Sequence, residues 1–244
     1  MPLLDVYNKW PLSITSAKGS RVFDSAGQTY LDMYGGHAVI SIGHGHHHYV
    51  QKLKEQLDQI AFYSNAVEIP GQQEAAMIMR RTSSYDEYKV FFCNSGAEAN
   101  ENALKIASFA TRKKKIICFD QAFHGRTSLA AACTDMKDAT APVNESDNVI
   151  RIPTGDAAVV EERLRKNDVA AILFETISGV GGCHQLSQEF LLDLKVLAKR
   201  HDCLLIADEI QSGTKQTSSL FVAFKSLSVS GDSWIGYLVP PGRD

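Results

Sequence analysis

The sequence predicts an α/β fold, in which a mostly parallel sheet is covered by helices on both faces. Short apolar segments, such as residues 115–119, 169–175 and 203–208, are typical of strands buried on both sides of a sheet. Amphipathic segments with apolar residues at helical spacing lie between them. A chain of 244 residues that is 44% hydrophobic can also bury a sizeable core. Strands that alternate with helices in this way indicate a parallel sheet.

The elements follow one another regularly after an irregular beginning. Residues 20–42 read as short strands separated by turns, and Gly35 and Gly36 mark a break. The stretch from residue 120 to about 150 is irregular, and the final thirty residues show no helical period. We expect helices at residues 47–60, 71–84, 97–110, 156–167 and 187–201, and strands at residues 89–93, 115–119, 169–175 and 203–208.

Polar residues gather where four of these strands end. Ligands of parallel α/β sheets bind outside the carboxyl ends of the strands, so we expect these residues to line one polar crevice. They are Asn94, Ser95 and Gly96 after the first strand, Phe123, His124 and Arg126 after the second, Glu175 after the third, and Asp208 after the fourth.

Composition and charge argue against nucleic acid or a membrane as a partner. A net charge of −3 and a pI near 6.2 give no general attraction to polyanions or anionic lipids. The one basic run, residues 112–115, is better explained as cations at a helix end. No apolar stretch approaches the roughly 18 residues of a membrane span, and the first residues lack the features of a signal peptide. Five cysteines without close pairing favour a reducing, cytoplasmic setting.

Ser95 admits two interpretations. With Glu98 three residues later it forms the pattern of a capping box, which needs no ligand. Alternatively, the small residues Gly96 and Ala97 leave backbone N–H groups open to an anion at a helix N-terminus, where the Ser95 hydroxyl would also reach it. The sequence leaves both open.

Three further residues point towards a flat, charged ligand. Phe123 could stack on a planar ring, and the guanidinium of Arg126 suits a carboxylate, although a core phenylalanine and a surface arginine are the simpler explanations. Asp208 is the stronger signal. An acid at the end of a run as apolar as residues 203–207 is costly to bury unless a cation pairs with it.

Five segments in order resemble the class III pyridoxal-phosphate aminotransferases: YLDMYGGHAVISIGHGH, NSGAEANENALKIA, AFHGRTSLA, ETISGVGG and LLIADEIQSG. Within that family the chain is similar above all to the acetylornithine and succinylornithine aminotransferases. The resemblance covers residues 5–213. It implies the PLP-transferase fold type I, with residues 1–45 as the N-terminal part of the small domain and residues 46–213 as part of the large cofactor-binding domain.

The resemblance also implies roles for individual residues around pyridoxal 5′-phosphate. A pyridinium kept protonated by a buried carboxylate is the electron sink that the chemistry needs. By resemblance, the cofactor phosphate would be held by Ser95, Gly96 and Ala97, and the ring would stack on Phe123. The ring nitrogen would pair with Asp208 and the phenolic oxygen with Gln211. The substrate α-carboxylate would bind Arg126, and we expect His124 and Glu175 to support these residues.

The implied reaction moves an amino group from N-acetylornithine, or a similar ω-substituted amine, to 2-oxoglutarate. Its substrates are therefore an amino acid and a 2-oxo acid, and relatives of this kind are homodimers with sites at the subunit interface.

Two departures from the family pattern concern substrate selection and a histidine cluster. Val180 and Ser178 stand where many relatives have glutamate or glutamine, and His47 stands where a proline is usual. The cluster of His44, His46, His47 and His48 could suggest a metal site, but no acidic or cysteine partner accompanies it, so we expect no metal there.

The lysine that forms the family's Schiff base has no counterpart in this chain. Counting on from Asp208 leads to the neighbourhood of Tyr237, and the only later lysines are Lys215 and Lys225, whose spacing and neighbours differ from the family's. Residues 214–244 carry no resemblance. We therefore expect a truncated, C-terminally incomplete enzyme with an aberrant tail, such as a frameshift produces, and no activity of its own.

Two alternatives belong to other functional classes. The chain could be a non-catalytic fragment that binds the cofactor weakly or pairs with a full-length relative. A serine hydrolase could be imagined from residues 230–234, SGDSW, but that stretch lies in the tail and lacks nearby acid–base partners of convincing order.

Overall fold

The computed structural model describes residue 4 and residues 8–83, 88–213 and 238–239. The chain divides into two compact units, Met1–Ile69 and Pro70–Asp244, which are described separately. This division differs from the boundary between residues 45 and 46 that the sequence suggested, because the helix after residue 46 groups with the first unit. The assignment of the family's domains to these units stays a prediction.

The first unit is built on a small antiparallel sheet of β1 (Ile14–Lys18), β2 (Arg21–Asp24) and β3 (Thr29–Leu31), in that order. The turn between β2 and β3 is held by Asp24, whose carboxylate accepts from the backbone N–H groups of Ala26 and Gln28 at 2.9 and 2.8 Å. This side-chain-to-backbone bonding is typical of aspartate in turns. The expected short strands and turns are therefore present.

The break expected at Gly35 and Gly36 is present, but residues 37–43 form no strand after it. The segment labelled α1, Gly35–Ala38, is a turn in which all four residues have φ between 57° and 62°. Left-handed backbone costs glycine little, so Gly35 and Gly36 allow the chain to turn here. Helix α2, His47–Gln59, follows close to its expected position.

The second unit contains a four-stranded parallel sheet. Its strands, in spatial order, are β10 (Leu204–Asp208), β7 (Val169–Glu175), β5 (Lys115–Phe119) and β6 (Val149–Ile152). The ladder between β10 and β7 ends with Asp208 opposite Glu175. Two carboxyl groups therefore lie side by side where β10 and β7 end.

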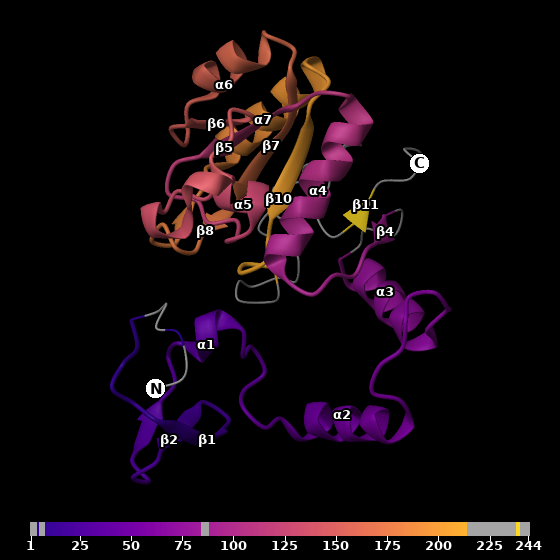
Figure 1. Ribbon diagram of the computed structural model, residues 1–244, viewed down its shortest axis with the longest axis vertical. Helices are drawn as coiled ribbons and strands as arrows, with labels where there is room; N and C mark the ends of the chain where they lie inside the picture. The colour runs from indigo at the N-terminus through magenta and orange to yellow at the C-terminus, as the bar shows by residue number, and fades with distance from the viewer. Residues whose placement is uncertain (1–3, 5–7, 84–87, 214–237, 240–244) are drawn as a thin grey trace. The chain divides into compact units, whose positions relative to one another are not determined.

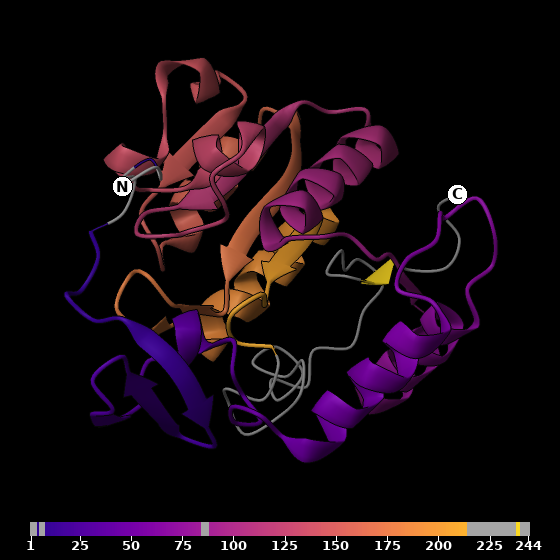
Figure 2. The same ribbon diagram turned by 60° about the horizontal axis from the view of Figure 1, so that its bottom comes forward.

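Helices cover both faces of this sheet, as expected (Figure 1). α4 (Gly96–Thr111) and α5 (Ser128–Cys133) lie on one face, and α6 (Ala157–Leu164) and α7 (Gln188–Arg200) on the other. Figure 2 shows α4 running beside β10 and β7. Alternate strand residues face opposite clusters: Ile117, Phe119, Ile172 and Phe174 pack with Leu164, Phe190 and Leu194, whereas Ile116, Cys118, Ala171 and Leu173 pack with Leu104 and Ala107.

The basic run near residue 112 serves the fold. Arg112 is the C-terminal cap of α4, with a left-handed backbone. The Lys113 ammonium donates to the carbonyls of His201 and Asp202, both at 2.7 Å, at the end of α7. A cation at a helix C-terminus satisfies carbonyls that have no partner within the helix. The expected cationic helix end is thus present, although the helix that Lys113 caps is α7.

The strand expected at residues 89–93 is largely wrong. β4 covers only Lys89–Val90, follows α3 (Pro70–Ser83), and pairs antiparallel with β11 (Leu238–Val239) outside the parallel sheet. Phe91 and Phe92 are exposed. A strand is defined by a ladder partner, which an apolar run in one segment does not specify.

The stretch from residue 120 to 150, expected to be irregular, contains several short elements. They are α5 and β6, with the 3-10 helices η1 (Lys137–Ala139) and η2 (Pro142–Asn144) between them. A small hairpin of β8 (Ile177–Ser178) and β9 (His184–Gln185) follows β7. No helix in the described ranges is long and apolar enough to cross a membrane.

We predict that Ile172→Ala lowers the free energy of unfolding by about 2–5 kcal/mol, because it leaves a cavity in the middle of β7 where the side chain has no exposure. Val196→Ala on the outer side of α7, where the side chain is 55% exposed, should change it by less than about 0.5 kcal/mol. Urea denaturation followed by circular dichroism measures both. Equal losses would contradict this account of the core.

Candidate active site

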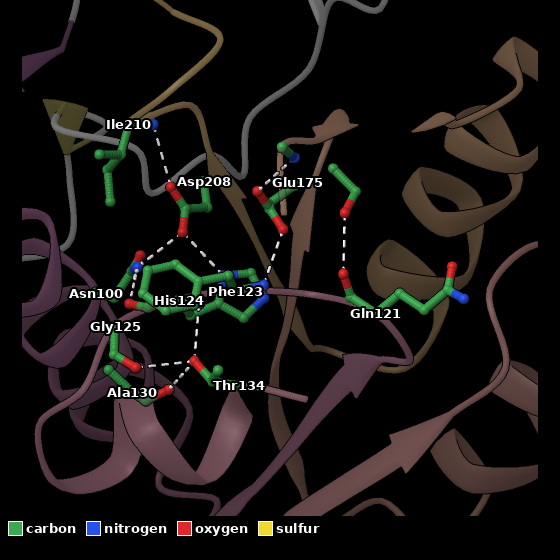
Figure 3. A network of polar contacts seen from close by, with 12 residues as sticks. Asn100, Gln121, Phe123, His124, Gly125, Ala130, Thr134, Glu175, Asp208 and Ile210 are labelled. Carbon is green, nitrogen blue, oxygen red and sulfur yellow. Dashed lines mark hydrogen bonds and ion pairs between the residues drawn. The ribbon is translucent and has the colours of Figure 1, made fainter. Parts of the chain in front are cut away.

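Asp208 is the centre of a buried hydrogen-bond network at the carboxyl end of the sheet (Figure 3). Its Oδ2 accepts from Asn100 Nδ2 and from His124 Nδ1, both at 2.8 Å. Its Oδ1 accepts from the backbone N–H of Ile210 at 3.1 Å. The three donors come from α4, from the loop after β5 and from the residues after β10. The carboxylate is therefore fixed from three sides.

His124 is fully buried beneath this carboxylate. Its backbone N–H donates to Thr134 Oγ1 at 2.9 Å, and the Thr134 hydroxyl lies 2.9 Å from the carbonyl of Gly125. Burial alone would lower the pKa of His124, but its hydrogen bond to Asp208, the charge of Asp208 and that of Glu175 outweigh burial and raise it. Nε2 of the ring has no hydrogen-bond partner among the described residues.

Glu175 connects two loops that border Asp208. One carboxylate oxygen accepts from the N–H of Phe123 at 3.0 Å, and the other accepts from the N–H of Gly179 at 3.3 Å. Burial is the main cause that raises the pKa of Glu175, with a further contribution from the nearby Asp208 charge. Glu175 thereby fixes the main chain at Phe123, the aromatic residue expected to stack on a ring.

The N-terminus of α4 contains one half of the capping box that the sequence suggested: Ser95 is the N-cap, but Glu98 bonds to the N–H of Asn94 and not to that of Ser95. Ser95 Oγ accepts from the N–H of Glu98 at 3.2 Å, as an N-cap does. The Glu98 carboxylate turns back to the N–H of Asn94 at 2.7 Å. A capping role does not exclude anion binding by the same turn, so the phosphate site at Ser95, Gly96 and Ala97 stays a prediction.

Close packing explains why small residues surround this turn. A Cβ on Gly96 would lie 2.6 Å from Ile210 Cδ1, and a Cβ on Gly125 would lie 2.8 Å from Ala97 Cβ. The first turn of α4, the loop after β5 and the residues after β10 are therefore in contact. The structure brings Ser95, Gly96, Ala97, Phe123 and Asp208 into one region.

Gln211 lies against the loop that follows β8. A Cβ on Gly179 would fall 1.4 Å from Gln211 Oε1, so a larger residue there would displace the end of the Gln211 side chain. Ser178 of the same loop bonds to the carbonyl of Gln121 at 2.9 Å and accepts from the N–H of Gly181, which is a structural role. Val180 is exposed.

Arg126 is exposed and directly follows Gly125 in the loop after β5. Its predicted role with a substrate carboxylate is untested by these contacts. In the histidine cluster, His44 has an acidic partner that its own stretch of sequence does not contain, because its Nε2 lies 2.7 Å from Asp32 Oδ2. Within residues 8–83, 88–213 and 238–239, no group of three or more histidine, cysteine or acidic side chains could hold a metal ion.

Sequence reasoning missed two members of the network, Asn100 and Thr134. Both are buried polar residues, with 4% and 1% exposure. Asn100 stands in α4 among the buried Ala103, Leu104 and Ala107, and a buried amide on the apolar side of a helix needs a partner. That signal was present in the sequence, but the partner, Asp208, lies 108 residues away.

Comparisons with known proteins identify the family. Residues 5–235 match the family described as aminotransferase class-III. The chain belongs to the class III aminotransferase family. This family is PLP-dependent, acts on amino acids and keto acids, and falls within EC 2.6.1.

Curated relatives of this class III aminotransferase chain include two acetylornithine aminotransferases. The one from Halalkalibacterium halodurans is 39% identical over 233 residues, which is 94% of this chain and 59% of the relative. The one from Bacillus amyloliquefaciens is 40% identical over 222 residues, which is 90% of this chain and 95% of that sequence. The chain thus spans about three fifths of the longer relative's length.

Solved structures confirm the predicted PLP-transferase fold. The ornithine aminotransferase from Toxoplasma gondii ME49 superposes with a TM-score of 0.85 at 28% identity, covering 93% of this chain and 55% of that one. The N-acetylornithine aminotransferase from Stenotrophomonas maltophilia K279a gives a TM-score of 0.77 at 30% identity, covering 91% and 57%.

We predict that stability depends on pH through His124. A histidine whose folded-state pKa is raised stabilises the fold fully below its unfolded pKa, near 6.5, and this contribution is lost as pH rises through the higher folded value. The free energy of unfolding should therefore fall as pH rises above 6.5, and fall less steeply in His124→Asn. Urea titrations between pH 5.5 and 8.5 measure the slope of the free energy of unfolding against pH. His184→Asn, at an exposed histidine, is the control, and equal slopes in wild type and His124→Asn would refute the prediction.

Proposed function

We propose that residues 1–244 form the cofactor-binding part of an acetylornithine-type aminotransferase, and that this part binds pyridoxal 5′-phosphate through the Asp208 network. The observation that supports this most strongly is the buried carboxylate of Asp208, held by three N–H donors next to the N-terminus of α4. A buried carboxylate is costly unless a cation or donors compensate it. A protonated ring nitrogen suits the acceptor capacity that remains on Oδ1.

The described residues suit both the phosphate and the ring of pyridoxal 5′-phosphate. The first turn of α4 offers a helix N-terminus with the hydroxyl of Ser95, and its small neighbours Gly96 and Ala97 leave the backbone accessible to a phosphate. Phe123 is partly exposed in a loop whose main chain Glu175 holds, which suits ring stacking. Gln211, whose side chain lies against Gly179, would reach the phenolic oxygen.

When bound, the cofactor supplies an electron sink for cleavage of the amino acid Cα–H bond. The chain's own contribution is binding and orientation. Asp208 would hold the ring nitrogen protonated, Phe123 would limit water on one ring face, and Arg126 would orient the substrate through its α-carboxylate.

The amino donor we propose is N-acetylornithine or a similar ω-substituted amine, with 2-oxoglutarate as the acceptor. The names of the curated relatives support the donor. The choice of 2-oxoglutarate as the amino acceptor rests on the family resemblance. A homodimer with sites at the subunit interface belongs to the same proposal.

The polypeptide of residues 1–244 should bind the cofactor without completing a transamination. Lys215 and Lys225, the only lysines after Asp208, lie outside the described residues and do not have the family's spacing. A second candidate role is a non-catalytic chain that binds the cofactor weakly or pairs with a full-length relative. Co-purification with such a relative, together with inactivity of the isolated chain in a transaminase assay, would support the second role.

We predict that Asp208→Asn weakens the binding of pyridoxamine 5′-phosphate at least about tenfold, the loss expected when a charge-assisted hydrogen bond becomes neutral. This form of the cofactor has no aldehyde, so it cannot react with surface lysines. Fluorescence titration measures the affinity. Asp193→Asn on the exposed side of α7 is the control, and equal affinity in all three proteins would contradict the role of Asp208.

We also predict that borohydride reduction of the chain with pyridoxal 5′-phosphate yields no adduct at a single defined lysine, because no lysine occupies the family's position. Peptide mass spectrometry identifies the reduced residue. Stoichiometric trapping at Lys215 or Lys225 would show that one of them replaces the family's lysine.

A further inference from the structure

We propose that Asn100 is a positioning residue that orients Asp208 towards the cofactor ring, so that one helix, α4, supports both the phosphate site and the acid at the ring nitrogen. This inference rests on the proposed function. Asn100 is not among the residues expected to contact the cofactor, and it acts through Asp208.

The contacts of Asn100 use both hydrogens of its side-chain amide. Nδ2 donates to Asp208 Oδ2 at 2.8 Å and to the carbonyl of His124 at 2.7 Å (Figure 3). An amide nitrogen has two N–H donors, so neither remains for another partner. Only 4% of the residue is exposed, and both bonds are therefore shielded from water. This single side chain ties α4 to the loop after β5 and to the end of β10.

The pair of donors on Oδ2 determines which oxygen of Asp208 is available. Asn100 and His124 both bond to Oδ2, whereas Oδ1 receives one backbone N–H, from Ile210. Each carboxylate oxygen can accept about two hydrogen bonds. Among the described residues, the acceptor position that remains is therefore on Oδ1, and Asn100 completes the occupation of Oδ2.

Helix α4 gives this arrangement its rigidity. Asn100 lies five residues after Ser95, the N-cap, which corresponds to about 7.5 Å along a helix axis. The turns that follow Asn100 are anchored in the core by Ala103, Leu104 and Ala107. The spacing between an anion at the N-terminus of α4 and the carboxylate of Asp208 is thus set by one rigid element, which holds a site more accurately than two loops would.

A purely structural role is the alternative, in which Asn100 only joins α4 to the loop at His124. The two roles predict different changes in ligand affinity when Asn100 is replaced. A structural role affects every ligand of the site equally, whereas a positioning role affects ligands in proportion to their use of Asp208.

The experiment compares Asn100→Leu, which keeps the shape of the side chain without its donors, with Asn102→Leu. Asn102 belongs to the same helix, and its amide donates to the carbonyl of Glu98 near the surface. The ligands are pyridoxamine 5′-phosphate and its analogue with carbon in place of the ring nitrogen. We expect Asn100→Leu to bind the first about tenfold more weakly and the second unchanged, with Asn102→Leu equal to wild type for both. Equal losses for both ligands, or no loss for either, would overturn the inference.

A measurement without ligand separates this inference from the proposed function. The Nδ1 proton of His124, bonded to Asp208, should shift its NMR resonance in Asn100→Leu and keep it in Asn102→Leu. If wild type binds neither ligand, the proposed function fails, and this resonance alone decides whether Asn100 positions Asp208: an unchanged resonance refutes it. Should Asn100→Leu not fold, Asn100→Ser, which keeps a shorter donor, replaces it with the same expected pattern.

Discussion

The hydrogen bonds to Asp208 are the interaction on which the rest of the site depends. A carboxylate that is 6% exposed must be compensated, and the chain supplies donors from α4, from the loop after β5 and from the main chain after β10. Those donors hold together the loops that carry Phe123 and Ile210. The close packing of Gly125 against Ala97 belongs to the same arrangement, because a side chain at Gly125 would meet both Cα and Cβ of Ala97.

The parallel sheet explains why the two acids lie together. Asp208 and Glu175 are register partners at the ends of β10 and β7, so the fold places two carboxyl groups at one edge. They receive different partners. Asp208 receives two side-chain donors and one backbone donor and is buried, whereas Glu175 receives backbone donors from two loops and is partly exposed. The environment of Asp208 suits a charged ligand, whereas Glu175 holds the two loops in place.

Much of this arrangement could be predicted from the sequence, for identifiable reasons. The strands at residues 115–119, 169–175 and 204–208 are apolar on both faces, and their periodicity differs from that of the helices. Asp208 was recognisable because an acid ended such a run. β4 could not be predicted because its length depends on a pairing partner, and the bond from Asn100 to Asp208 could not because it joins segments 108 residues apart. Neither the length of β4 nor the bond from Asn100 to Asp208 can be inferred from a local sequence pattern.

That long separation has a consequence for the order of folding. Asn100 and His124 emerge from the ribosome well before Asp208, and until β10 docks beside β7 their polar groups have no carboxylate to meet. Parallel pairing between distant segments closes slowly, because loop-closure entropy is lost before the contacts form. The end of the sheet that carries Asp208 is therefore completed late. Until β10 docks, β7 is an unpaired edge strand, and exposed apolar surface and unpaired strand edges of this kind are what chaperones protect in nascent chains.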